Sequence, residues 1–401
     1  MRIGSCAMRK WAPLLLLAGS AWPAMAAKSV TVGQVDQLLF ALRGKSDAKV
    51  AQELSDVELT ERVSPARLAH WEADFPGSRT HEALIKLADL AAFLNPPAAD
   101  VLPIPAPDSE TQDRMLALAA EYVKTTVTRI PNFVATRETT HFEDTPSRPG
   151  AFAIVPNRVK GPMAAGEVNR TDAKALRQTG SYPATVAYRD GKEVPESAGA
   201  THGKDEPPPV GLTTSGEFGP ILSVAIGDAV RSEVTWQRWE QGASDPVAVF
   251  RYAVPAEQSN YMLEIPTDNK LERVYPGYHG EIAIDPATGA ILRISMVTEP
   301  ASPSEAMQAA ISVEYAPVAI GGQSYICPVH GVAFSRLPLS HGSAVQPGST
   351  VGLQTQLNDV IFSQYHVFRS ETRIANDASG TGAAAPAAAN STRTVPADHQ
   401  P

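Results

Sequence analysis

The spacing of apolar residues changes near Asn132, and that change constrains the fold more than any other feature. Before it, apolar residues recur at steps of three and four, as on one face of a helix. After it, they alternate with polar residues, as in strands with one buried face. The pattern predicts an α+β fold in which an N-terminal helical bundle precedes a curved antiparallel sheet, half-barrel like, of about ten strands with one packed helix.

Helix start and stop signals follow one another at short intervals in the first part of the chain. Thr31 and Gln34 form a capping-box pattern before an apolar stripe, and Gly44 is placed to end that helix. Ser64 followed by Pro65 is typical of another helix start. We expect further helices to begin at Asp47 and Thr80, and a longer helix at Asp108 or Ser109.

Hairpin signals follow one another in the second part. The clearest prediction is a hairpin over 281–294, turned by Asp285-Pro286 and Gly289. A second hairpin is expected to pair 311–318 with 325–334 across Gly321-Gly322, and a last strand to run from about 360 to 374. A helix over 217–230 interrupts the strands.

Composition along the chain indicates where these parts meet. Prolines cluster after the head, a polar segment interrupts the strands and contains one expected hairpin at Asp190-Gly191, and the C-terminal end has no aromatic residue. We therefore divide the chain into a signal peptide over 1–26, a helical head over 27–95, a Pro-rich linker over 96–107, a connecting helix over 108–131, a sheet domain over 132–375 with a mobile loop over 157–212, and a disordered tail over 376–401.

The first residues predict export. A leucine-rich stretch too short to span a bilayer follows three basic residues and precedes the small-residue pattern Ala24-Met25-Ala26. We expect cleavage before Ala27 and a periplasmic or secreted mature protein. The basic residues are Arg2, Arg9 and Lys10.

Net charge and cysteine content restrict the class of ligand and the disulfide bonds that the chain can have. The formal net charge of −9 argues against a nucleic-acid ligand, which requires a basic surface. Cleavage before Ala27 would remove Cys6 and leave Cys327 unable to form an internal disulfide. Because Cys327 lies in a strand-like run, it is predicted to be a buried thiol, and Cys327-x-x-His330 alone is only half of a metal motif.

No established catalytic motif is present in the sequence. Nucleophile-elbow, zinc-protease, phosphate-loop and dinucleotide patterns are all missing. His279, His330 and His366 lie in or beside expected strands and could meet at a metal, but packed or surface histidines are the expected outcome. We therefore predict a protein that is not an enzyme, with no catalytic residue, metal or cofactor.

Aromatic residues on two adjacent expected strands suggest a binding surface. Strict alternation places Trp236 and Trp239 on opposite faces, whereas Phe250 and Tyr252 share a face. A curved sheet with such a face can enclose an acyl chain, with an arginine at the rim for a head group; the alternative is that the aromatics pack against the helix over 217–230. The candidate ligand-binding residues are Trp236, Arg238, Trp239, Phe250, Arg251, Tyr252, Tyr261 and Tyr278.

Four segments also carry a resemblance to known proteins: 236–240, 249–252, 280–294 and 313–318. They resemble the later strands of the LolA-like unclosed half-barrel, the fold of the periplasmic lipoprotein carrier and of a related stress sensor that regulates a sigma factor. The whole chain is also similar to an uncharacterised exported family from soil acidobacteria. The resemblance implies an unclosed half-barrel that binds a lipid or lipoprotein segment and assigns no individual residue.

Three functional classes follow. The first is a non-enzymatic exported protein that binds a lipid, a lipoprotein segment or another apolar ligand on the concave sheet, and it predicts an apolar cavity between helix and sheet. The second is an envelope scaffold with a protein partner, and it predicts a filled sheet interior and an exposed apolar patch on the head. The third is a hydrolase, which requires a cleft where a histidine and a carboxylate meet.

Overall fold

In the computed structural model of the chain, residues 27–125, 129–144, 176–194, 212–267, 270–299, 308–338 and 353–367 are described. They fall within one compact unit that ends at Phe368. The predicted signal peptide and C-terminal tail lie outside these residues, as do 157–175 and 195–211 of the predicted loop. Among the residues described, no helix is both long and apolar enough to cross a membrane.

The four helices of the head pack around one apolar cluster because each presents apolar side chains on one side, mainly aliphatic ones and Trp71 on the third helix. The capping box is confirmed: the Gln34 amide donates to Thr31 Oγ1 at 3.2 Å, and Gln34 Oε1 accepts from the Thr31 amide at 2.9 Å. The helices are α1 (Val32–Leu42), α2 (Asp47–Ser55), α3 (Pro65–Asp74) and α4 (Ser78–Leu90).

The head also contains a small parallel sheet that the sequence analysis did not predict. Strand β1 (Lys28–Val30) pairs with β2 (Val57–Leu59). Each strand has three residues, too few to establish an alternating pattern in the sequence. Their pairing depends on the fold of the head, which brings segments from either side of α1 and α2 together.

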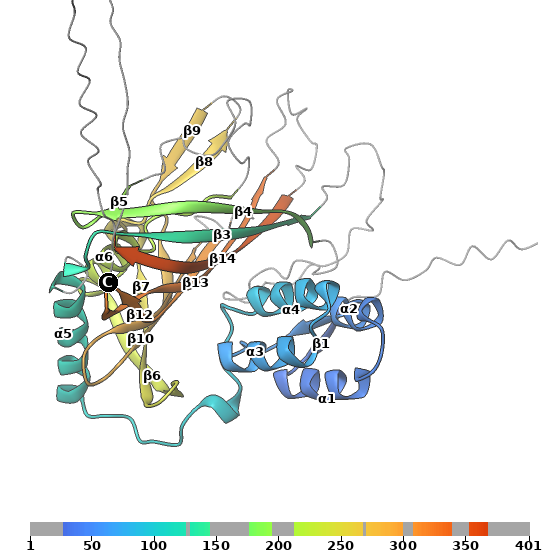
Figure 1. The fold of residues 1–401 in the computed structure, drawn as a ribbon. Helices are drawn as coiled ribbons and strands as arrows, with labels where there is room; N and C mark the ends of the chain where they lie inside the picture. The colour runs from blue at the N-terminus through green and yellow to red at the C-terminus, as the bar shows by residue number, and fades with distance from the viewer. Residues whose placement is uncertain are drawn as a thin grey trace, which may run out of the picture. The chain divides into compact units, whose positions relative to one another are not determined.

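The predicted antiparallel sheet is present, with ten strands, and it is not closed (Figure 1). Both predicted hairpins are confirmed, and so is the turn at Asp190-Gly191. In pairing order the strands are β5 (Lys192–Val194), β4 (Leu176–Arg189), β3 (Phe133–Asp144), β14 (Leu353–Val367), β13 (Gln323–Pro338), β12 (Gln308–Ile320), β11 (Ile291–Thr298), β10 (Tyr278–Ile284), β7 (Pro246–Val254) and β6 (Glu233–Gln241).

Two strand predictions need correction. Beside the expected hairpin at Asp190-Gly191, the segment 176–184, which was predicted to be part of a mobile loop, also belongs to β4, and β4 pairs along the whole of β3. Its outward residues are mainly small or polar, so the alternation that identifies a half-buried strand is weak there. Strand β14 begins at Leu353, seven residues earlier than expected. In addition, β8 (Leu263–Thr267) pairs with β9 (Lys270–Val274) in a separate two-stranded sheet.

The sheet buries apolar side chains on both faces. On β12, Ile311 and Val313 belong to one cluster with α5 (Ser109–Thr125) and α6 (Pro220–Ala229), whereas Ala310 belongs to another with side chains of α4 and the residues after it. Because residues of odd spacing point to opposite faces of a strand, these clusters cover opposite faces. We call the α5 and α6 side the inner face and the α4 side the outer face.

Candidate functional site

The inner face is the predicted binding surface, and in this structure α5 and α6 cover it (Figure 1). Helix α6 lies on the connection between β5 and β6, which are the two outermost strands of the sheet. The chain therefore leaves one edge, places α6 over the inner face and enters the other edge. Residues that α6 buries in the inner cluster are Ile221, Leu222, Ala225, Ile226 and Ala229.

Three of the six predicted ligand-binding aromatics lie in this packed cluster, and the other three lie at its margin. Phe250, Tyr252 and Tyr278 are fully buried in it, and Tyr252 donates to the Ser295 carbonyl at 2.8 Å. Trp236, Trp239 and Tyr261 pack against its margin and are partly exposed. The space in which an apolar cavity was expected is thus occupied by side chains, and a ligand would have to replace one of the covering helices.

The two tryptophans correct the sequence analysis. Their indole rings meet with centroids 4.9 Å apart, so they share a face instead of pointing to opposite faces. The reason is an irregularity between Trp236 and Arg238, where the pairing with β7 shifts by one residue. Such a bulge inserts one unpaired residue, here Gln237, and reverses the alternation after it. Trp236 also makes an edge contact with Phe250 at 5.3 Å.

The two arginines expected at the rim lie elsewhere. Arg251 is exposed on the opposite side of β7 from Phe250 and Tyr252, as alternation predicts. Arg238 lies on the outer face, where its guanidinium binds Glu281 at 2.7 Å and Glu240 at 2.6 Å. Both are therefore separated from the inner aromatics by the sheet itself.

A buried carboxylate anchors the C-terminal end of α6. Asp228 accepts hydrogen bonds from the Tyr278 hydroxyl and the Asn260 amide, both at 2.8 Å, and forms an ion pair with Arg231 at 2.8 Å. Burial alone raises the pKa of Asp228, but the hydrogen bonds from Asn260 and Tyr278 lower it below its ordinary value. Asp228 therefore stays ionised and holds α6 to the inner face.

A second buried carboxylate lies just before α6. Glu217 pairs with Arg137 of β3 at 3.2 Å, and its carbonyl accepts from the Tyr315 hydroxyl at 3.0 Å. The adjacent Phe218 inserts among aromatic rings of the sheet, including an edge contact with Phe362 at 5.1 Å. The α6 segment is thus held by polar groups at both ends and by an aromatic ring at one.

A polar depression lies beside the Asp228 anchor. Its volume is about 430 Å³, and it is open to solvent. Its lining consists of Arg231, Glu257, Gln258, Ser259 and Asn260. Because two of these residues bind Asp228, this depression adjoins the polar anchor and not the apolar cluster.

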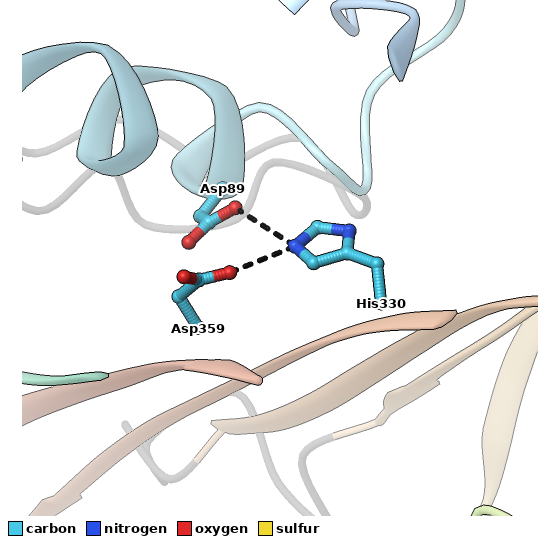
Figure 2. A group of neighbouring side chains, drawn as sticks. All are labelled: Asp89, His330 and Asp359. Carbon is cyan, nitrogen blue, oxygen red and sulfur yellow. Dashed lines mark hydrogen bonds and ion pairs between the residues drawn. The ribbon is translucent and has the colours of Figure 1, made fainter. Parts of the chain in front are cut away.

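The three strand histidines do not come together. His279 pairs with Glu299 at 3.1 Å, and His366 contacts the Gln364 carbonyl of its own strand. His330 instead binds Asp359 of β14 at 2.8 Å and lies 3.8 Å from Asp89 of α4 (Figure 2). No pattern in the sequence indicates either carboxylate, because Asp89 is 241 positions away and neither aspartate forms a metal-ligand spacing with His330.

The charges around His330 perturb one another. Burial raises the pKa of Asp89 well above its ordinary value, and the neighbouring Asp359 carboxylate adds to this shift. Burial lowers the pKa of His330, but the carboxylates of Asp359 and Glu314 outweigh it and raise that pKa well above its ordinary value. Side-chain exposure is 1% for Asp89 and 22% for His330, so this group is not an open cleft of the kind that a hydrolase requires.

The single cysteine of the described residues is buried, as predicted. Cys327 lies on β13 among aromatic and aliphatic side chains. Burial raises its pKa to about 12. A thiol with this pKa is a packing residue and not a nucleophile.

Comparison with known proteins gives no further assignment. No family model, curated protein sequence or solved structure matches this chain.

Proposed function

We propose that this chain is an exported, non-enzymatic binding protein that takes up an apolar ligand, such as an acyl chain, on the inner face of its sheet. In this proposal, α6 is a displaceable cover. The observation that carries the proposal is the position of α6, which lies on the connection between the two outermost strands of an open sheet and over its largest apolar cluster. Removing α6 would uncover the part of that surface beneath it, with α5 still in place and no pair of strands broken.

The composition of α6 supports this role. A helix of ten residues has little stability by itself and depends on the surface beneath it. It contains Gly227, which lowers helix stability, and the small residues Ala225 and Ala229 at positions that face the sheet. An apolar ligand can replace such contacts because hydrophobic burial is not directional.

In the described residues, the scaffold alternative meets one of its two expectations, a filled sheet interior, but not the other, an exposed apolar patch on the head. The head exposes one large apolar side chain there, Phe40 of α1, and the guanidinium of Arg43 lies over its ring. A single exposed residue is not the patch that a scaffold role predicts. The proposal therefore places the ligand on the sheet.

Native mass spectrometry of protein purified from the periplasm, followed by organic extraction, tests the proposal directly. We expect a discrete added mass that extracts as lipid. A second measurement is titration of the delipidated protein with a fluorescent fatty acid. No copurified lipid, together with no saturable binding of the fatty acid, would contradict an apolar-ligand role.

Two variants of adjacent residues test whether α6 is the cover. Gly227 is exposed and an added Cβ would meet nothing within 4 Å, so Gly227→Ala should stabilise α6 and reduce fatty-acid uptake about fivefold. Asp228→Asn weakens the anchor at the end of the same helix and should increase uptake about tenfold. Circular dichroism spectra should show that both variants fold. Equal uptake in both would show that the ligand enters elsewhere.

A further inference from the structure

The group formed by Asp89, His330 and Asp359 lies on the outer face and is independent of the proposed ligand site. It joins the last turn of α4 to β13 and β14, and one ligand-type atom from each residue lies within 4.8 Å of the others (Figure 2). Asp359 and Leu357 are two residues apart on β14 and therefore share the outer face. These side chains converge from three elements on one point.

The Asp89 carboxylate is incompletely satisfied. Its residue is 1% exposed, and Oδ2 has no hydrogen-bond partner among the described residues. The second carboxylate of the group, Asp359, is 5% exposed. A buried carboxylate oxygen without a partner is costly, so a positively charged group in contact with it would be strongly favoured.

The arginines on the outer face do not supply a positive charge to Asp89 and Asp359. Along the same face, the carboxylates of Glu240 and Glu281 contact the guanidinium groups of Arg62, Arg238 and Arg293. Among the described residues, the carboxylates of Asp89, Asp359 and Glu314 have His330 as their one cationic partner in ion-pair range. Even a protonated His330 balances one of these carboxylates and leaves negative charge buried.

We infer that Asp89, His330 and Asp359 bind a divalent transition-metal ion, with Zn²⁺ the best match. One imidazole and two carboxylates form an N/O donor set that suits Zn²⁺, whereas Mg²⁺ and Ca²⁺ favour oxygen donors alone. The separations of His330 Nε2 from the two carboxylates, 2.8 and 3.8 Å, bracket the roughly 3.4 Å between ligands of a tetrahedral zinc ion. Glu314, 3.7 Å from His330 Nδ1, is placed to orient the imidazole.

The ion would have a structural role. It would join α4 of the head to two adjacent strands of the sheet, and metal that binds only the folded state stabilises it. Phe93 follows Asp89 by four residues, just after the end of α4, and packs on the outer apolar cluster. The site would therefore hold the head to the outer face where their apolar contact already begins.

Isothermal titration with Zn²⁺ tests the inference on tag-free, chelator-treated protein. We expect about one Zn²⁺ per chain, a higher melting temperature with Zn²⁺, and no comparable effect of Mg²⁺ or Ca²⁺. Asp89→Asn and Asp359→Asn should each weaken Zn²⁺ binding by about a hundredfold. Asp89→Asn should still fold, because it removes a buried charge at nearly constant volume.

His279→Gln is the matched control, because His279 is also a strand histidine paired with a carboxylate, the exposed Glu299. It should bind Zn²⁺ as the unmodified chain does. Zn²⁺ affinity that is unchanged in Asp89→Asn would overturn the inference. Failure of the unmodified chain to bind Zn²⁺ would also overturn the inference. If Asp89→Asn then raised the melting temperature, a proton shared by the two carboxylates would be what neutralises the site.

Discussion

At the scale of single residues, burial decides the chemistry of Cys327. The pKa of about 12 implies that about one thiol in ten thousand is ionised at pH 8. We expect iodoacetamide to leave Cys327 unmodified in the folded protein for hours, and to alkylate it within minutes after denaturation in urea. Peptide mapping by mass spectrometry measures both. Rapid alkylation of the folded chain would show that β13 is more open than described.

At the residue scale, a single bulge is enough to make a prediction from strand alternation wrong. Alternation predicts the faces of Phe250, Tyr252 and Arg251 correctly, because β7 pairs regularly with β10. It fails for Trp236 and Trp239 because of the bulge at Gln237. Neither glycine nor proline marks this bulge in the sequence, so only the pairing with β7 reveals it.

At the scale of elements, the β10–β11 hairpin meets α5 at Gly289. This glycine has φ +76°, and an added Cβ would lie 2.4 Å from the Leu118 carbonyl carbon of α5. Gly289→Ala should therefore cost about 1–2 kcal/mol for its backbone conformation, and a clash with rigid backbone should add to that cost. Urea unfolding measures the free energy.

Gly322 provides the control for this prediction. It turns the β12–β13 hairpin with φ +85°, and its added Cβ would meet nothing within 4 Å. Gly322→Ala should therefore show the conformational cost alone. Equal losses of stability for both variants would indicate that α5 does not pack closely on the β10–β11 turn.

At the scale of the whole molecule, Glu240 links the head to the sheet. Its carboxylate binds Arg62 of the head at 2.8 Å and Arg293 of β11 at 3.0 Å. Although burial raises the pKa of Glu240, these arginines and Arg238 outweigh it and lower that pKa to about 2, from an ordinary 4.5. The ionised form is thus favoured by folding, by up to about 3 kcal/mol.

The sign of this linkage sets the pH window. Because the pKa of Glu240 is lower in the folded state, its stabilising contribution is complete above about pH 4.5 and is lost as the pH falls towards about 2. Glu240→Gln should therefore be less stable than the unmodified chain at pH 7, and the difference should shrink between pH 4.5 and pH 3. Urea unfolding at each pH measures this difference. The exposed Glu233→Gln on the same strand is the control, and a difference independent of pH would contradict the linkage.

Local signals account for the part of the fold that the sequence could predict. The capping box at Thr31, the turns at Gly289 and Gly322, and the helix that contains Ala225 all depend on residues within a few positions of one another. Pairing between β14 and β3 joins segments more than 200 positions apart, and no local pattern specifies it. Asp89 and His330 are also more than 200 positions apart, so no local pattern predicted their contact.

The sequence alone determined the period of each segment, and with it the helical head, the open antiparallel sheet and the buried Cys327, because periodicity and turn chemistry act over a few residues. Only the tertiary structure decided that α6 fills the inner face, that the candidate aromatics pack beneath it, and that two aspartates meet a histidine on the outer face. These outcomes depend on which elements pack together. Packing joins surfaces from distant parts of the chain. Residues that form one site therefore do not have to form any pattern in the sequence.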